Sequence, residues 1–430
     1  MTSKFTFAAV IRGSILSALC VCLLPGITLA QQYYDPGLLR KTIDRKPVEF
    51  EPVGMRWGSF MVGAGAELVY EHNDNIFYFT NLEVADSITH VRPWFDLNSD
   101  WNRHELNFSV MADIGNYSDF DGQDFEDWAA RLDGRIDVKR GSSFNYNIFA
   151  MRLHEDRSSP DDVNGIRPTE FAYDGFDVGY SHTFNRLTVD LNYDRNDTDY
   201  QNNIRLSGTI VDNQDRDRTR DALTLKLDYE LANQRHVFLR VAGNNVDYDQ
   251  VFDNVGFERS SNGYSLQAGM SWDLTGVLVG NAYLDYIDQE YDDPRFTNVT
   301  GFGIGGSLVW TPTQLTNISF LARNGPQETT QIGSSGYFST LYSVRLQHEL
   351  RRNWLLNVRA SYTDNDYGIK GGSEELLTDT QVTRAGLGLI YLFNRNFYLS
   401  GGYVYEKQKA NLSRYGYRTN RWFLTLGAEL

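Results

Sequence analysis

One short run of alternating charges is the strongest chemical signal in the sequence. The run Arg131-Leu132-Asp133-Gly134-Arg135-Ile136-Asp137 places four charges of alternating sign at every second position. In a β-strand, side chains at every second position share one face. If that face lines a water-filled passage, opposed charges create a transverse field that orients polar solutes and filters them by charge. The alternative is that the four residues are hydrated wall residues paired with their neighbours.

Other charged side chains recur with the same every-second-residue spacing in neighbouring segments. An arginine turned toward hydrocarbon at the middle of a bilayer would cost about 2–4 kcal/mol, so we place these side chains on the inner, wet face. The predicted charge filter, which lines the lumen, consists of Arg131, Asp133, Arg135, Asp137, Asp113, Arg240, Arg345 and Arg359.

Phe149 shares its face with Asn145, Asn147 and Met151 and is therefore expected to point inward. An aromatic face can stack on a sugar ring, so Phe149 is a candidate glycan-stacking residue. The alternative is that the ring packs beneath a loop folded into the lumen.

Signals for catalysis or metal binding are weak. The seven histidines lie far apart, and neither a Gly-x-Ser-x-Gly turn nor a phosphate-binding glycine loop occurs. We predict no catalytic residue, metal or cofactor, although a Ser–His pair on neighbouring strands would leave no linear motif. Two acidic stretches, Asp119–Asp127 and Asp212–Arg218, lack the EF-hand spacing and are interpreted as solvated loops that could share divalent cations with lipopolysaccharide.

The first thirty residues have the pattern of a secretory signal peptide. Lys4 and Arg12 precede an apolar run that ends in Thr28-Leu29-Ala30. Both cysteines, Cys20 and Cys22, would leave with it, which excludes a disulfide framework. Removing two basic and no acidic residues moves the formal charge from -16 to -18, and this acidity argues against a nucleic-acid partner.

The rest of the chain repeats one pattern, in which apolar residues take every second place over about ten positions. In the segment Ser99–Gly115 these are Leu106, Phe108, Val110, Ala112 and Ile114. Tight polar turns alternate with long loops rich in Asp, Asn, Gly and Ser. Counting the segments from Ser59–Tyr70 to Tyr417–Leu430 predicts eighteen strands, with sixteen as the alternative.

Three features favour a transmembrane barrel over a soluble all-β fold. The segments are long enough to cross a bilayer at a tilt. Tight turns on one side and long loops on the other are typical of outer-membrane barrels. Aromatic residues such as Tyr70, Trp101 and Trp310 gather at strand ends, where rings with one wet edge favour the water–lipid boundary.

We therefore predict an all-β, antiparallel up-and-down barrel in the outer membrane of a Gram-negative cell. The expected organisation is a signal peptide over residues 1–30, a short periplasmic segment over 31–56 and the barrel over 57–430. The final strand ends in an apolar residue, Leu430, which is the type of signal read by the barrel-insertion machinery. A barrel of this size is too wide for its side chains to fill, so water occupies the interior.

Two stretches resemble the putative β-barrel porin 2 family. These are Phe50–Phe77, with Pro52, Gly54, Arg56, Gly58, Ser59 and Phe60 at the family's motif positions, and the turn Trp101-Asn102-Arg103-His104. The resemblance implies an outer-membrane barrel associated with exopolysaccharide secretion. It also implies a separate partner, a periplasmic polysaccharide-export ring protein, to complete the path to the inner membrane.

The sequence leaves three functions open. The resemblance favours a conduit for exopolysaccharide export, whereas the residues alone favour general diffusion of small hydrophilic solutes. The third alternative is a non-conducting structural or adhesin barrel. Outer-membrane lipid and lipopolysaccharide are expected partners in all three.

Overall fold

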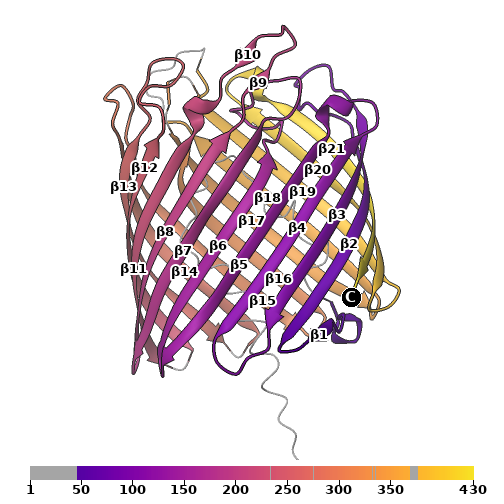
Figure 1. The fold of residues 1–430 in the computed structure, drawn as a ribbon, viewed down its shortest axis with the longest axis vertical. Coiled ribbons are helices and arrows are strands. Elements are labelled where there is room, and N and C mark those ends of the chain that lie inside the picture. Colours follow the sequence, from indigo (N-terminus) through magenta and orange to yellow (C-terminus); the bar gives the residue numbers. More distant parts are fainter. Residues whose placement is uncertain (1–45, 233, 275, 332, 335, 369–375) are drawn as a thin grey trace, which may run out of the picture.

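The alternating segments form the wall of a closed antiparallel β-barrel in the computed structural model (Figure 1). The structure describes residues 46–430 except 233, 275, 332, 335 and 369–375. The predicted signal peptide and residues 31–45 of the predicted periplasmic segment therefore lie outside the described residues.

The prediction of eighteen wall strands is confirmed. In chain order the wall strands are β2 (Phe60–Asn73), β3 (Asp86–Ser99), β4 (Glu105–Tyr117), β5 (Phe125–Lys139), β6 (Ser142–His154), β7 (Glu170–Phe184), β8 (Leu187–Tyr200), β11 (Arg218–Ala232), β12 (Arg235–Tyr248), β13 (Ser261–Leu274), β14 (Leu278–Tyr291), β15 (Val299–Thr313), β16 (Thr316–Glu328), β17 (Gly336–Arg351), β18 (Trp354–Asp366), β19 (Asp379–Leu392), β20 (Phe397–Ala410) and β21 (Tyr417–Glu429). Each pairs with its neighbours in the chain, and β21 pairs with β2 from Gly65↔Glu429 to Asn73↔Arg421, which closes the wall. Closure leaves no unpaired edge, as a lipid environment requires.

The described part of the chain contains no helix that is long and apolar enough to span a membrane.

The apolar side chains of the alternating segments lie on the outside of the barrel, as predicted. Large apolar residues on this face are exposed, among them Leu191 on β8, Leu223 on β11, Phe302 on β15 and Leu387 on β19. A contiguous exposed apolar surface of this kind is stable only against hydrocarbon. In the pairing register, outward-facing residues of one strand lie opposite outward-facing residues of the next strand. The alternate, polar side chains of the same strands therefore face the lumen.

Tight turns close the end of the barrel that we assign to the periplasm. Gly141, between β5 and β6, has a φ of +77°, and Asn185, between β7 and β8, has a φ of +57°. Residues that tolerate positive φ are needed here because two-residue hairpin turns match the twist of the flanking strands only in that region.

The described start of the chain docks at this end. Strand β1 (Met55–Trp57) pairs with the beginning of β2, and a 3-10 turn, η2 (Val48–Phe50), precedes it. Phe50 packs against inward-facing Leu355, Ile390, Leu392 and Tyr398. Lys46 forms an ion pair with Glu429 near the end of β21. The predicted periplasmic segment is thus partly held against the inner wall.

The long loops at the other end carry small elements of their own. These are η3 (Asp121–Gln123), the hairpin of β9 (Asn203–Ile204) and β10 (Ile210–Val211), η4 (Gln214–Arg216) and η5 (Ser413–Tyr415). Figure 1 shows the β9–β10 hairpin standing above the rim of the barrel.

Candidate functional site

The alternating run on β5 lines the lumen. The register pairs Arg131 with Ser109 and Phe149, and Asp133 with Asn107 and Asn147, all on the inner face. Arg131 Nε lies 3.2 Å from Asp133 Oδ1, and Arg135 Nε lies 3.0 Å from Asp137 Oδ1. The side chains in these two pairs are 30–46% exposed, so each pair contributes only about 0–1 kcal/mol to stability. They remain accessible to a passing solute.

Asp113, also a member of the predicted filter, has a different environment. It faces inward, but its side chain is only 4% exposed. His90 Nδ1 lies 2.9 Å and Arg92 Nε 2.8 Å from its two carboxylate oxygens. A buried carboxylate that is fully hydrogen-bonded to the wall has little contact with water in the lumen. Asp113 therefore stabilises β3 and β4 rather than facing solutes.

The three remaining arginines of the predicted filter also face inward, on other parts of the wall. Arg240 on β12 pairs in register with Lys226 and Gln267. Arg345 on β17 lies directly opposite Arg359 on β18. Strands β17 and β18 lie nearly across the barrel from β5, with nine strands between β5 and β17 in one direction.

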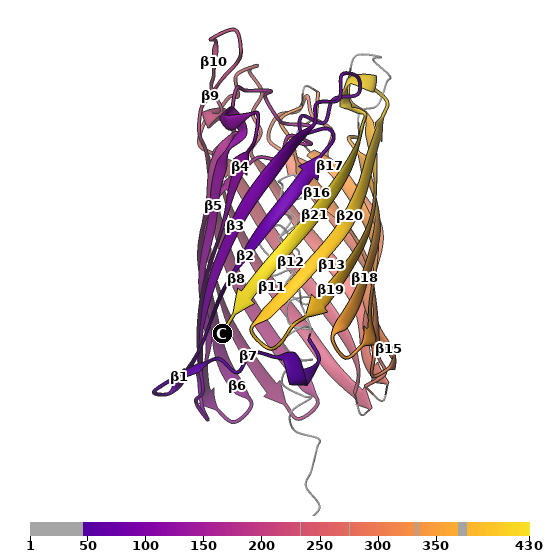
Figure 2. The ribbon, with the colours of Figure 1, turned by 90° about the vertical axis from the view of Figure 1, so that its right-hand side faces the viewer.

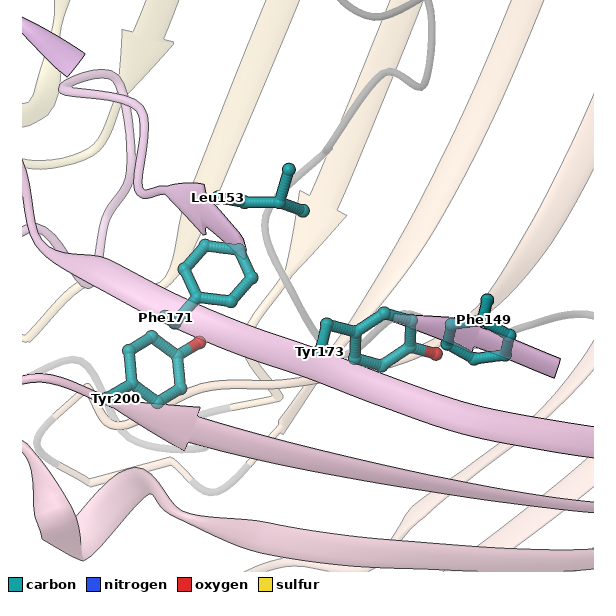
Figure 3. Close-up of a cluster of buried hydrophobic side chains, with 5 residues drawn as sticks. All are labelled: Phe149, Leu153, Phe171, Tyr173 and Tyr200. Carbon is teal, nitrogen blue, oxygen red and sulfur yellow. The ribbon is translucent and has the colours of Figure 1, made fainter. Parts of the chain in front are cut away.

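Phe149 packs inside the barrel rather than presenting a free ring face. It is 8% exposed, and its ring centroid lies 5.2 Å from that of Tyr173. Figure 3 shows the two rings side by side, with Phe171 and Tyr200 forming a second pair near Leu153. The ring is thus covered by side chains of neighbouring wall strands. The glycan-stacking role of Phe149 stays a prediction that its burial disfavours.

Replacing both Arg131 and Arg135 by Gln should shift the ion selectivity of the barrel toward cations. Two positive charges leave the lumen, while Asp133, Asp137 and Glu105 remain beside them. The measurement is the reversal potential across a planar bilayer with a salt gradient. The matched variant, Asp133→Asn with Asp137→Asn, should shift it the other way. Unchanged selectivity in both variants would exclude the filter.

The sequence analysis did not predict one feature at the mouth of the lumen: residues 155–169, which we call the mouth bridge, contact the opposite side of the barrel. At its root, Glu155 forms a two-pronged ion pair with Arg216, with N–O distances of 2.7 and 2.9 Å. Both side chains are 6% exposed, and the Arg216 guanidinium lies 3.8 Å from the centroid of the Tyr200 ring. Ser159 donates a further hydrogen bond to Glu155. This root is therefore rigid and dry.

Polar contacts hold the middle of the mouth bridge to neighbouring loops. The Arg157 guanidinium donates to Gln123 Oε1 at 2.7 and 2.9 Å and to Asp162 Oδ1 at 3.1 Å. Ile166 N donates to Ile204 O, which joins the bridge to the β9–β10 hairpin. The bridge thus takes its shape from the loops on both sides of it.

The tip of the mouth bridge reaches the far wall. Asp161 Oδ1 accepts hydrogen bonds from Thr329 Oγ1 at 2.8 Å and from Thr330 N at 3.1 Å, just beyond the end of β16. The bridge starts from β6 and ends at β7. Six strands (β8, β11, β12, β13, β14, β15) separate β7 from β16 on one side, and eight separate β6 from β17 on the other. These hydrogen bonds therefore cross the mouth close to its diameter.

The far-side anchor is itself held by several hydrogen bonds from neighbouring loops. Arg259, only 1% exposed, donates to the carbonyl oxygens of Thr329 and Ser334 at 2.8 and 3.0 Å and to Asp253 at 2.7 Å. Tyr415 Oη donates to Gln331 Oε1 at 2.9 Å. Because loops from several strands fix this anchor, the hydrogen bonds to Asp161 join two rigid sides of the mouth.

Burial perturbs the carboxyl groups of this loop assembly. It raises the pKa of Asp162 to about 6, although the adjacent Arg157 guanidinium acts in the opposite direction. Burial also raises the pKa of Asp217, beside η4, to about 6. Among the described residues, no group of three or more His, Cys, Asp or Glu side chains is placed to hold a metal ion. The assembly is held by hydrogen bonds and ion pairs instead.

The family described as "Putative beta-barrel porin 2" matches residues 46–430. The chain belongs to this family. It is thus an outer-membrane β-barrel porin, and the sequence-based assignment of its family and fold is confirmed. A comparison with curated proteins finds no match.

Among solved structures, the porin is similar to OccK2 (OpdF) of Pseudomonas aeruginosa, solved with glucuronate, at 13% identity and a TM-score of 0.46, covering 86% of this chain and 98% of that chain. It is also similar to OccAB3 of Acinetobacter baumannii, at 10% identity and a TM-score of 0.45, covering 87% and 100%. A third is OpdO of Pseudomonas aeruginosa, at 14% identity and a TM-score of 0.45, covering 86% and 97%.

Proposed function

We propose that this porin passes small hydrophilic solutes and that the mouth bridge sets their size limit. The supporting observation is the set of hydrogen bonds from Thr329 and Thr330 to Asp161, which ties opposite sides of the mouth together. A chain segment fixed across an opening divides it into narrower passages. Charged side chains on the lumen wall below then act on each solute that enters.

The bridge favours this function over exopolysaccharide export, the function that the sequence analysis preferred. A long polymer must thread the whole mouth, and a segment held at its root by the buried Glu155–Arg216 pair stands in that path. Small sugars and ions need only the passages beside it. Direct measurement of passage distinguishes this function from export and from a non-conducting adhesin barrel.

The test measures passage directly. Purified protein in liposomes should admit small sugars in a swelling assay and exclude long polysaccharides, and in planar bilayers it should show stable open channels. Absence of conductance would support a non-conducting barrel. Deletion of the gene that abolishes surface polysaccharide, with unchanged uptake of small solutes, would instead support export and overturn the proposal.

Conductance should also rise with pH through about 6. Because burial raises the pKa of Asp162 from 3.8 to about 6, the closed bridge binds its proton more tightly than an open loop does. The tighter binding of this proton stabilises the closed bridge relative to an open loop. This stabilisation is fully present below pH 3.8 and is lost as the pH rises through 6. The pKa difference between the open loop and the closed bridge corresponds to roughly 3 kcal/mol of bridge stability.

The measurement for this pH effect is single-channel conductance at pH 4.5 and pH 7.5. The control is Asp162→Asn, which keeps a similar shape but cannot ionise and should respond much less to pH in this window. A wild-type conductance that falls as the pH rises would contradict the expected sign.

A further inference from the structure

A groove runs along the outer, lipid-facing side of the barrel over β19, β20, β21 and β2, the face turned toward the viewer in Figure 2. Its volume is about 390 Å³, and its lining is almost entirely apolar. The lining residues are Tyr70, His72, Leu387, Leu389, Gly401, Gly402, Tyr403, Trp422, Phe423 and Leu424.

The strand register explains why the surface is hollow here. Gly401 lies between Leu389 and Leu424, so a position without a side chain is flanked by two large ones. One step toward the extracellular end, Tyr403 and Trp422 form a cross-strand pair with ring centroids 4.4 Å apart. The groove is therefore an elongated slot in the hydrocarbon zone with an aromatic wall at its upper part.

A cluster of basic side chains lies above the slot on the same two strands. Continuing up the register, Tyr405 pairs with Asn420 and Lys407 with Arg418, and Lys409 follows on β20. Lys407, Lys409 and Arg418 are all exposed, and we call them the basic cluster. Arg418 lies 3.2 Å from Glu83, whereas Lys407 and Lys409 form no ion pair within the described part of the chain.

The rest of the barrel's outer rim is acidic at this height. The register turns the following acids outward near the extracellular ends of their strands: Glu126, Asp174, Asp197, Asp199, Asp221, Asp247, Asp288, Glu290, Asp364, Asp366 and Asp379. On the described wall strands, the outward cations elsewhere at this height, Arg152 and Arg195, lie 3.1 and 3.3 Å from Asp174 and Asp221. The basic cluster is therefore the part of the rim that is best suited to bind an anionic group.

The spacing between slot and cluster fits a lipid. Lys407 is six positions after Gly401 in the sequence, which corresponds to roughly 20 Å along a strand. With a tilt of about 40°, the vertical distance is roughly 15 Å, half the thickness of a hydrocarbon core. A molecule that fills the slot with acyl chains would thus carry its headgroup to the level of the basic cluster.

We propose that this face of the barrel binds one phosphorylated glycolipid of the outer leaflet. Its acyl chains occupy the slot, and its phosphates contact Lys407, Lys409 and Arg418. Charge complementarity with an otherwise acidic rim selects this occupant over an uncharged lipid. The proposal depends on the placement of the barrel in the membrane and not on the bridge, so it stands or falls separately from the proposed passage of solutes.

A polar corner at the top of the slot supports the same occupant. Tyr70 Oη donates to Ser87 Oγ at 2.9 Å, and His72 Nδ1 lies 3.1 Å from the same oxygen. Both residues belong to the slot lining and are exposed. These groups already hydrogen-bond to one another, and the ester and hydroxyl groups near the head of a glycolipid can add to this polar network.

The test counts bound lipid by native mass spectrometry on the full-length porin, delipidated and then mixed with one purified lipid. The probes are bis-phosphorylated lipid A, the same lipid without phosphates, and phosphatidylglycerol. We expect one retained bis-phosphorylated lipid A, with binding weaker by roughly a hundredfold in the triple variant Lys407→Gln, Lys409→Gln, Arg418→Gln. Heat-modifiable migration on gels confirms that each variant is folded.

Matched variants separate this site from general charge effects. Arg152→Gln with Arg195→Gln removes rim cations elsewhere and should leave binding unchanged. Gly401→Leu should fill the slot and weaken binding with the basic cluster intact; a Cβ here meets its nearest atoms at 3.8 Å, so the barrel can accept it. Glu83→Gln removes the ion-pair partner of Arg418 and should strengthen binding of the lipid. Equal retention of dephosphorylated lipid A or phosphatidylglycerol, or unchanged binding in the triple variant, would overturn the proposal.

Discussion

Replacing residues 157–166 by a short Gly-Ser link should raise the single-channel conductance several-fold. The deletion removes Asp161, and with it the hydrogen bonds from Thr329 and Thr330 that hold the mouth bridge to the far wall. It leaves β6 and β7 joined and the wall pairing untouched. A wider mouth passes more ions at the same voltage and should admit larger sugars. Planar-bilayer recording and liposome swelling measure the two effects.

The matched control shortens only the tip of the β9–β10 hairpin, beyond Ile204, the residue through which this hairpin joins the bridge. Leu206, Ser207 and Gly208 form the exposed tip of the β9–β10 hairpin, which stands above the rim (Figure 1). Trimming this tip should leave conductance within error of the wild type. If both deletions leave conductance unchanged, the bridge does not limit the pore, and the constriction must lie deeper in the lumen.

Replacing Arg216 by Met should release the root of the bridge. The change leaves the Glu155 carboxylate buried without its cation, and breaking a buried pair in this way costs about 3–5 kcal/mol. Because the wall strands do not depend on this pair, the cost falls on the loop. We expect a folded barrel whose bridge is cut quickly by protease and whose channel fluctuates between a wild-type and a larger conductance.

A double variant distinguishes lost attraction from lost packing. Arg216→Met with Glu155→Met removes both charges and keeps apolar volume beside Tyr200, so it should recover most of the protease resistance. Arg216→Lys should recover only part, since an ammonium group cannot reproduce the two parallel hydrogen bonds. Equal protease sensitivity of the single and double variants would show that Glu155 is not the group that Arg216 stabilises.

For the charge filter and Phe149, the two-residue period of a β-strand predicts the face of each side chain but not its exposure to water. The period of two, anchored by apolar residues that must face lipid, places Arg131, Asp113 and Phe149 on the inner face. It cannot tell which inner-face residues water reaches. Asp113 is covered because His90 and Arg92 from β3 close around it, and Phe149 because Tyr173 from β7 packs on it. Those contacts depend on strand neighbours.

The sequence by itself determined the strand number, the face of each strand and the membrane setting, because hydrocarbon on one side imposes a strict alternation on every segment. It did not determine the mouth bridge or the outer groove with its basic cluster. Glu155 and Arg216 are 61 residues apart, and Asp161 and Thr329 are 168 apart. No local period links such positions. Only closure of the barrel, which brings distant loops over one opening and β2 beside β21, places them in contact.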